Sequence, residues 1–189
     1  TAIKMRIGIL GSSFNPPHEG HLKISDKAIN LFALDQIWWL ITKKNPFKNK
    51  NLYINFKERE NKIKSMIDNE RIKLKYFEEN TQSNYLIDNL LYIKSNFAEN
   101  EYIFLMGSDS FIEIDKWKDY NNIFKEIRIA VFNRGSNVNQ INNCKAGVEY
   151  NKFKFEYPGE EIFNNRLPSW TFISDFSINI SSSEMRKQK

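Results

Sequence analysis

Short apolar runs alternate with longer amphipathic stretches along most of this chain. The first run, at 5–10, reads Met-Arg-Ile-Gly-Ile-Leu, and its Ile and Leu content is typical of a strand covered on both faces. Residues 20–32 follow with apolar side chains at helical spacing, which predicts an amphipathic helix. The first 32 residues therefore predict a strand, a turn and a helix.

The same alternation continues through the later segments. Further strands are expected at 35–41, 71–77, 102–106, 127–132 and 170–173, and further helices at 56–67 and 84–97. Strands that alternate with helices favour an α/β fold, a doubly wound, Rossmann-like parallel sheet with helices on both faces. We expect one domain over residues 1–189, with a small C-terminal extension of helix and strand. Trp38, Trp39 and Trp170 are expected in its core.

Two segments lack this pattern. Residues 136–150 are polar and rich in Asn, which is typical of a surface loop. Residues 152–157 alternate aromatic side chains with Lys and Glu, which predicts a short strand with one face in water.

Chemistry-bearing residues follow several of the predicted strands, in the loops 11–21, 43–48, 107–109 and 133–135. Right-handed crossovers bring the carboxyl ends of parallel strands to one edge of the sheet. Ligands of such sheets bind outside those ends. The four loops therefore predict one active site.

Composition limits the cellular compartment and the kind of ligand that we expect, but it does not identify the activity. The 189 residues include one cysteine, so no disulfide forms within the chain, which fits the cytoplasm. No apolar run reaches the roughly 20 residues of a membrane-spanning helix. The net charge of +5 suits a polyanionic ligand or serves solubility alone.

Residues 11–21 read Gly-Ser-Ser-Phe-Asn-Pro-Pro-His-Glu-Gly-His and hold both histidines of the chain. A helix start carries unpaired N–H groups and partial positive charge, so this turn is suited to phosphate oxygens. His18 and His21 are three apart and can face one ligand there. The alternatives are structural histidines or zinc, but Cys144 is remote and a zinc site would need carboxylates.

The pattern Gly11-x-x-Phe14-x-Pro16-x-His18-x-Gly20-His21 resembles the signature of the HxGH nucleotidyltransferase superfamily. Later segments resemble bacterial nicotinate-nucleotide adenylyltransferases within it. They are 45–48 with Lys48, 84–90, with Leu86 and Asn89 where threonine is usual, 107–117 with Gly107, Asp109 and Trp117, 133–135, and 180–186.

This resemblance implies that the chain transfers AMP from ATP to nicotinate mononucleotide, giving deamido-NAD and pyrophosphate. The implied catalytic residues are His18, His21, Lys48 and Arg186. The implied ATP-binding residues are Gly11, Ser12, Ser13, Phe14, Gly20, Gly107, Arg134, Ser182 and Ser183. The implied substrate-binding residues are Tyr85, Asp88, Asp109 and Trp117.

The resemblance also implies Mg²⁺ bound with ATP rather than in a protein metal site, and no nucleic-acid or membrane partner. Each role has a plain structural alternative, such as core packing for Trp117 or a helix cap for Ser182 and Ser183. Three other functions stay open: an adenylyltransferase for nicotinamide mononucleotide, one for phosphopantetheine, and a nucleotide- or nucleic-acid-binding module without turnover. Assembly into a homo-oligomer is also left open.

Overall fold

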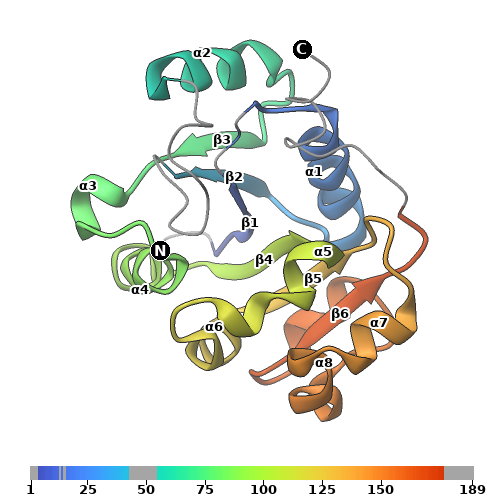
Figure 1. Cartoon of the computed structure of the whole chain (residues 1–189). Helices are drawn as coiled ribbons and strands as arrows, with labels where there is room; N and C mark the ends of the chain where they lie inside the picture. Colours follow the sequence, from blue (N-terminus) through green and yellow to red (C-terminus); the bar gives the residue numbers. More distant parts are fainter. Residues whose placement is uncertain (1–3, 13, 15, 43–54, 177–189) are drawn as a thin grey trace.

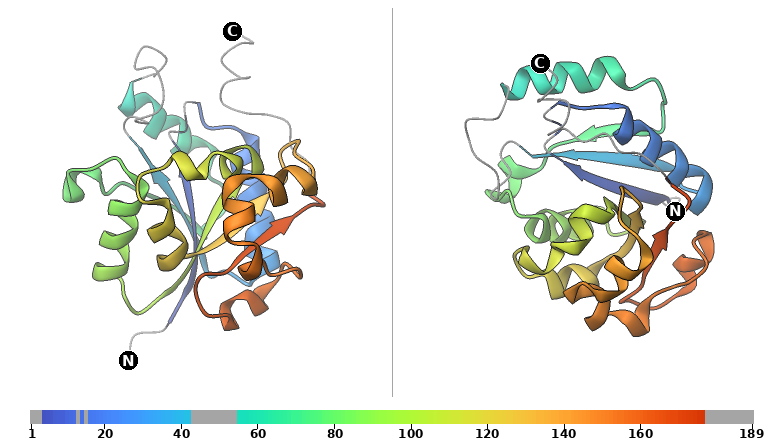
Figure 2. Two further views of the ribbon diagram at one scale, coloured as in Figure 1. Left: turned by 60° about the horizontal axis from the view of Figure 1, so that its bottom comes forward. Right: turned by 45° about the vertical axis from the view of Figure 1, so that its right-hand side comes forward.

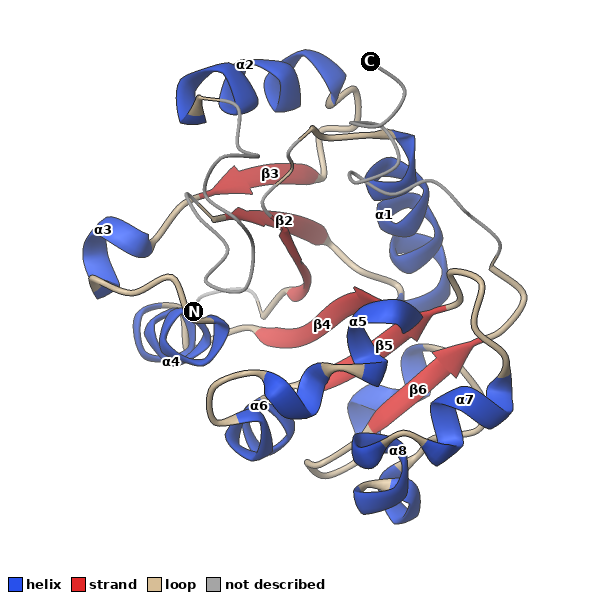
Figure 3. Cartoon of the chain, in the orientation of Figure 1, coloured by secondary structure: helices blue, strands red, loops and turns tan. Residues whose placement is uncertain are grey.

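The computed structural model describes residues 4–12, 14, 16–42 and 55–176, and these hold a six-stranded sheet in the order β3-β2-β1-β4-β5-β6 (Figures 1 and 3). Every neighbouring pair of strands is parallel. The strands are β1 (Arg6–Ser12), β2 (Gln36–Ile41), β3 (Ile72–Lys75), β4 (Glu101–Gly107), β5 (Arg128–Phe132) and β6 (Trp170–Ile173). The predicted doubly wound α/β sheet is confirmed.

The helices connect these strands in chain order. They are α1 (Glu19–Phe32), α2 (Phe56–Met66), α3 (Glu78–Thr81), α4 (Leu86–Asn96), α5 (Ser108–Ile112), α6 (Tyr120–Glu126), α7 (Val138–Asn143) and α8 (Lys145–Glu149), with 3-10 turns η2 (Ile114–Lys116), η3 (Asn151–Phe153) and η4 (Glu160–Asn164). None of the helices in the described ranges is long and apolar enough to cross a bilayer.

Alternate residues of each strand build two separate cores, one on each face of the sheet. In β2, Trp38 joins the core covered by α4 to α8, and Trp39 joins the core covered by α1, α2 and η4. Figure 2 shows these two helical layers on either side of the sheet. Trp38, Trp39 and Trp170 are all buried, as predicted. Because both faces are covered, the strands read as nearly continuous apolar runs.

Two predictions from the sequence are wrong. The segment 136–150 is not a loop, because it forms α7 and α8. Asn137 caps the start of α7 by accepting a hydrogen bond from the Gln140 N–H, and Ile141 of α7 and Ala146 of α8 are buried. Asparagine suits such helix starts, so an Asn-rich stretch is compatible with short helices.

The segment 152–157 is not a strand with one buried face. Its first part belongs to η3, and its pairing with β6 is limited to one isolated bridge between Lys154 and Trp170, where the Phe155 N–H donates to the Trp170 carbonyl at 2.7 Å. Phe153 is 42% exposed and Tyr157 is 80% exposed, so the alternating aromatic residues do not share a buried face.

The order in which strands are added to the sheet reverses after β3, because β2 and β3 lie on one side of β1 and β4, β5 and β6 lie on the other. The helix α1 after β1 and the helix α4 before β4 pack on opposite faces, so the carboxyl ends of these two strands flank the switch point. Ligands of doubly wound sheets bind in the crevice outside this point. The fold therefore places the loops after β1, β4 and β5 where a ligand is expected.

Candidate active site

The turn between β1 and α1 is fixed by its own two histidines. His18 is the N-cap of α1, and its Nδ1 accepts a hydrogen bond of 3.0 Å from the Gly20 N–H. In return, the His18 N–H donates to Nδ1 of His21, also at 3.0 Å. This reciprocal pattern is a capping box in which two imidazoles replace the usual hydroxyl and carboxylate.

The cap also sets where each neutral imidazole carries its proton. Because Nδ1 is an acceptor in both rings, the N–H of each ring is at Nε2. The two rings are stacked with centroids 3.9 Å apart, and Nε2 of His21 lies 3.4 Å from the Ser12 hydroxyl. The turn therefore carries two Nε2–H donors on stacked rings, a kind of group that suits phosphate oxygens.

His18 is held neutral at physiological pH. Burial of the ring and, as a smaller cause, the positive charge of Arg134 together lower the pKa of its imidazole from 6.5 to about 4. Both influences oppose a second proton on the ring. His18 is therefore suited to donate a hydrogen bond to an anion, not to act as a cation or a proton acceptor.

The loops after β4 and β5 meet beside this turn. Oγ of the buried Ser108 accepts a hydrogen bond of 2.8 Å from the Arg134 N–H. A Cβ atom on Gly107 would lie 2.4 Å from Cδ of Arg134 and 2.6 Å from Oδ1 of Asp109. Only glycine permits this approach, so Gly107 brings the arginine and the carboxylate together at the end of β4.

The turn that carries Arg134 has a fixed shape. Oδ1 of Asn133 accepts from the N–H groups of Gly135 and Ser136, at 3.1 and 3.0 Å. Gly135 has a φ of 89°, in the left-handed region that favours glycine. Asn133 and Gly135 thus set the direction in which the backbone presents Arg134.

Trp117 packs on the face of the sheet that α4 to α8 cover. Its side chain is half-buried and packs edge-on against Phe104, with ring centroids 6.3 Å apart. The same Phe104 ring would lie 3.4 Å from a Cβ on Gly11 at the end of β1. Phe104 therefore links the histidine turn to Trp117, whose partial exposure leaves it able to take both of its predicted roles, core packing and ligand contact.

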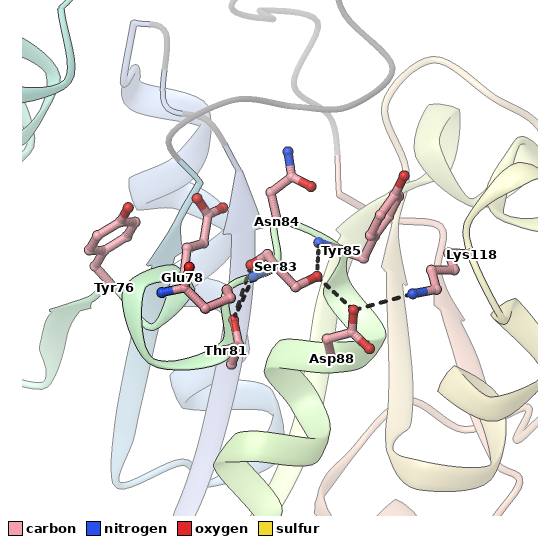
Figure 4. A pocket seen from close by; sticks show the side chains of 9 residues that line it. Tyr76, Glu78, Thr81, Ser83, Asn84, Tyr85, Asp88 and Lys118 are labelled. Atoms are coloured by element: carbon pink, nitrogen blue, oxygen red, sulfur yellow. Dashed lines mark hydrogen bonds and ion pairs between the residues drawn. The ribbon is translucent and has the colours of Figure 1, made fainter.

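A pocket of about 670 Å³ opens beside α4 (Figure 4). It is lined by Tyr76, Glu78, Thr81, Gln82, Ser83, Asn84, Tyr85, Asp88 and Lys118. Two of the four predicted substrate-binding residues, Tyr85 and Asp88, lie in its wall. The histidines, Asp109 and Trp117 do not line it. Lys118 does line it, so the wall of the pocket includes the residue that follows Trp117 in the sequence.

Asp88 is held by two partners within this pocket. It accepts a hydrogen bond of 2.6 Å from the Ser83 hydroxyl and lies 3.4 Å from Nζ of Lys118. Lys118 Nζ is also 4.9 Å from the centroid of the Tyr85 ring. Asp88 thus ties the segment 84–90 to the segment after Trp117, an arrangement that orients the wall of the pocket.

The two residues that replace threonine have structural roles. Asn89 is buried, and its Nδ2 donates to the carbonyl groups of Ser83 and Tyr85, at 3.1 and 2.9 Å. Leu86 packs against the core on the α4 face. Asn89 therefore fixes the turn before α4.

The structure brings together the described members of the predicted ATP-binding set around the ends of β1, β4 and β5. Gly11 and Ser12 end β1, Phe14 precedes the two histidines and Gly20 lies between them. Gly107 ends β4, and Arg134 follows β5. Ser13, Lys48, Ser182, Ser183 and Arg186 lie outside the described residues, so their roles stay predictions. The predicted loop 43–48 and a helix bearing Arg186 lie there too.

Sequence reasoning missed four residues that shape this site. Ser108, Phe104, Asn89 and Lys118 gained no functional role from the motifs, although each lies within or next to one. Their roles depend on contacts with distant segments, such as the bond between Ser108 and Arg134. Among the residues described, no three His, Cys, Asp or Glu side chains gather in a group that could hold a metal ion.

Comparison with known proteins agrees with this geometry. The cytidylyltransferase-like family model matches residues 9–188. A relative from Pelagibacter ubique, named "probable nicotinate-nucleotide adenylyltransferase", is 38% identical over 186 residues, covering 97% of this chain and 93% of its own. A relative of the same name from Rhizobium johnstonii is 32% identical and covers 96% and 92%.

Solved structures show the same fold. The Plasmodium falciparum nicotinic acid mononucleotide adenylyltransferase complexed with NaAD superposes with a TM-score of 0.70 at 24% identity, over 97% of this chain and 83% of that one. The same enzyme complexed with APC superposes with a TM-score of 0.68. On its family model and its relatives, the chain belongs to the cytidylyltransferase-like family and, within it, to the nicotinate-nucleotide adenylyltransferases.

Proposed function

We propose that this protein transfers the AMP group of ATP to nicotinate mononucleotide, which gives deamido-NAD and pyrophosphate in NAD biosynthesis. The observation that carries the proposal is the pair of Nε2–H donors of His18 and His21, held by a reciprocal cap beside Arg134. Relatives that bear the name of this activity cover nearly the whole chain.

The reaction requires alignment and charge neutralisation rather than a covalent enzyme intermediate. A phosphate oxygen of the mononucleotide attacks the α-phosphorus of ATP, a new P–O bond forms, and the bond to the pyrophosphate oxygen breaks. Negative charge spreads over the phosphate oxygens during this step. Donors fixed in advance stabilise that charge without reorganisation at the moment of reaction.

His18 and His21 supply such donors in the proposed mechanism. Their Nδ1 atoms are occupied by backbone N–H groups, so each ring is held in orientation while Nε2–H meets a phosphate oxygen. Arg134 supplies positive charge from the end of β5. Lys48 and Arg186 complete the predicted set of cations.

The mononucleotide is proposed to lie on the Trp117 side of β4. Trp117 is half-buried, so part of its ring is available to stack on the pyridine ring. Asp109 lies in the first turn of α5, next to Gly107 and Arg134, and is proposed to order this loop around the ribosyl phosphate. Tyr85 and Asp88 form the neighbouring wall.

A divalent cation, Mg²⁺, is proposed to accompany ATP. In this proposal the ion is carried by the phosphates of ATP and by water rather than by a cage of protein ligands. When bound, the ion neutralises charge on the phosphates, and the protein groups above provide orientation.

Pyrophosphate release from Mg-ATP tests the proposal, with nicotinate mononucleotide, nicotinamide mononucleotide and phosphopantetheine supplied separately. We expect release with nicotinate mononucleotide and formation of deamido-NAD, identified by its mass. The His18→Ala/His21→Ala double variant is the matched control and should release little. Turnover only with another acceptor would reassign the substrate, and binding of ATP without turnover would favour a binding module.

A further inference from the structure

Behind the histidine turn, two buried side chains form a hydrogen-bonded chain that ends on His21. Ser25 is on α1, one turn after His21, and its hydroxyl donates to the His21 carbonyl at 2.8 Å. The same hydroxyl oxygen accepts a hydrogen bond of 2.8 Å from Nε1–H of Trp39 in β2. Both side chains are fully buried, at 0% exposure. The chain therefore joins the sheet to the backbone of His21.

Trp39 also reaches the His21 ring through Phe14. The indole of Trp39 is stacked on Phe14, with centroids 4.9 Å apart and planes at 15°. Phe14 in turn contacts the His21 imidazole, with centroids 4.6 Å apart. One indole thus fixes His21 on two sides, at its carbonyl group through Ser25 and at its ring through Phe14.

The backbone of Phe14 makes this support necessary. Its φ is 51°, in the left-handed region, where a residue other than glycine costs about 1 to 2 kcal/mol. Such a conformation persists only where packing holds it. Phe14 is 0% exposed and its ring lies between Trp39 and His21, so the stack holds the strained residue in place.

We propose that Ser25 and Trp39 are positioning residues that hold the His21 imidazole in register for its donor role. The inference rests on the proposed function, in which His21 contacts the phosphates of ATP. Neither residue touches that ligand. Their effect passes through the carbonyl and the ring of His21.

The molecule contains a matched control for this proposal. Trp170 is also fully buried, it donates Nε1–H to the Tyr150 carbonyl at 2.7 Å, and it stacks on Phe111 with centroids 4.7 Å apart. It begins β6, at the opposite end of the sheet from the histidine turn. Trp39→Phe and Trp170→Phe therefore each remove one buried indole N–H donor and part of one aromatic stack.

The first experiment measures steady-state kinetics and thermal unfolding of both variants. We expect similar falls in Tm, because each loses one buried hydrogen bond and part of one stack. Trp39→Phe should lower kcat about tenfold or more, since a displacement of about 1 Å can cost a hundredfold. Its KM for nicotinate mononucleotide should not change, and Trp170→Phe should retain the wild-type kcat.

Ser25→Ala tests the middle of the hydrogen-bonded series that runs from Trp39 through Ser25 to His21. It removes the hydrogen bond to the His21 carbonyl and should lower kcat in the same way. In the double variant Ser25→Ala/Trp39→Phe, the two losses should add only in part, because both variants break the same hydrogen-bonded path to the His21 carbonyl. Equal kcat values in Trp39→Phe and Trp170→Phe, or fully additive losses, would overturn the proposal.

A second readout needs no catalysis. The chain contains only two histidines, so long-range ¹H–¹⁵N spectra of the imidazoles show His18 and His21 alone once any purification tag is removed. We expect Trp39→Phe and Ser25→Ala to shift the His21 ring signals and Trp170→Phe to leave them unchanged. Unchanged His21 signals in all three would contradict the proposal. Inactivity of the wild type with the shifts present would instead contradict the proposed function.

Discussion

Arg128 begins strand β5 and Arg134 follows its carboxyl end, and the two arginines make different contacts. At the amino end, Arg128 donates to three backbone carbonyls, those of Ile162, Phe163 and Asn165, at 2.9 to 3.1 Å. At the carboxyl end, the backbone of Arg134 is fixed by Ser108, and its charge acts on His18. Arg128 fastens η4 to the sheet, whereas Arg134 adds charge to the candidate active site.

The same difference extends across both ends of the sheet. At the amino end, Arg6 is paired with Glu101 at 3.4 Å and with Glu160 at 3.1 Å, so opposite charges meet within the protein. At the carboxyl end, His18 is kept neutral and its acceptor nitrogen is occupied by Gly20. The amino end therefore serves stability, and the carboxyl end holds donors in advance for an anion.

The largest effect is expected from the histidines. His18→Ala and His21→Ala should each lower kcat about 100- to 1,000-fold, because each removes one donor that stabilises transition-state charge. Pyrophosphate release measures the loss. Both also weaken the cap of α1, so a fall in stability of about 1 kcal/mol should accompany it. Near-normal kcat in both variants would remove the distinction between the two ends.

Arg134→Gln and Arg128→Met compare the two arginines directly. Arg134→Gln should lower kcat about 100-fold, because a cation beside the reacting phosphates is lost. Arg128→Met should keep kcat and lower the free energy of unfolding by about 2 kcal/mol, because buried carbonyl groups lose their donor. Kinetics and urea unfolding of both variants make the test. An exchange of the two outcomes would show that the assignment is reversed.

The pH dependence of stability sharpens the account of His18. In the unfolded chain this ring binds a proton below its ordinary pKa of 6.5, but in the folded protein it does so only near pH 4. The unfolded state thus holds more protons in this range, so stability falls as pH falls from about 6.5 to 4. At pH 5 the loss from this group is about 2 kcal/mol.

Urea unfolding at pH 7 and pH 5 measures this loss. His18→Asn is the control, because its side-chain oxygen can still accept the Gly20 N–H while the titrating group is gone. We expect a smaller drop in stability for the variant between the two pH values. Equal drops would show that His18 is not held neutral by its surroundings.

The smallest effect is expected at the cap of α7. Asn137→Ala removes the acceptor for the Gln140 N–H, 2.8 Å away, and should cost about 1 kcal/mol. Thermal unfolding measures the loss, and kcat should be unaffected because α7 carries none of the predicted site residues. A loss of activity at unchanged Tm would connect this region to the site.

The sequence alone determined the strands, the main helices and the position of the histidine turn. Apolar runs such as 102–106 reflect burial on both faces, and the spacing in 20–32 reflects a helix packed on one side, so local pattern is sufficient for both. It was insufficient for α7 and α8, where few side chains are buried and Asn caps resemble loop residues. The aromatic alternation in 152–157 also misled, because Phe153 and Tyr157 are exposed and only Phe155 packs against the core.

Only the tertiary structure decided how the site residues act on one another. The influence of Arg134 on His18, the bond between Asp88 and Lys118, and the path from Trp39 through Ser25 to His21 each join segments distant in sequence. Periodicity reports which side of one element is buried, not which neighbour covers it. Hydrogen bonds and pKa shifts depend on that neighbour, so the pKa of His18 and the support of His21 are defined only once β1, β2, β4 and β5 lie side by side.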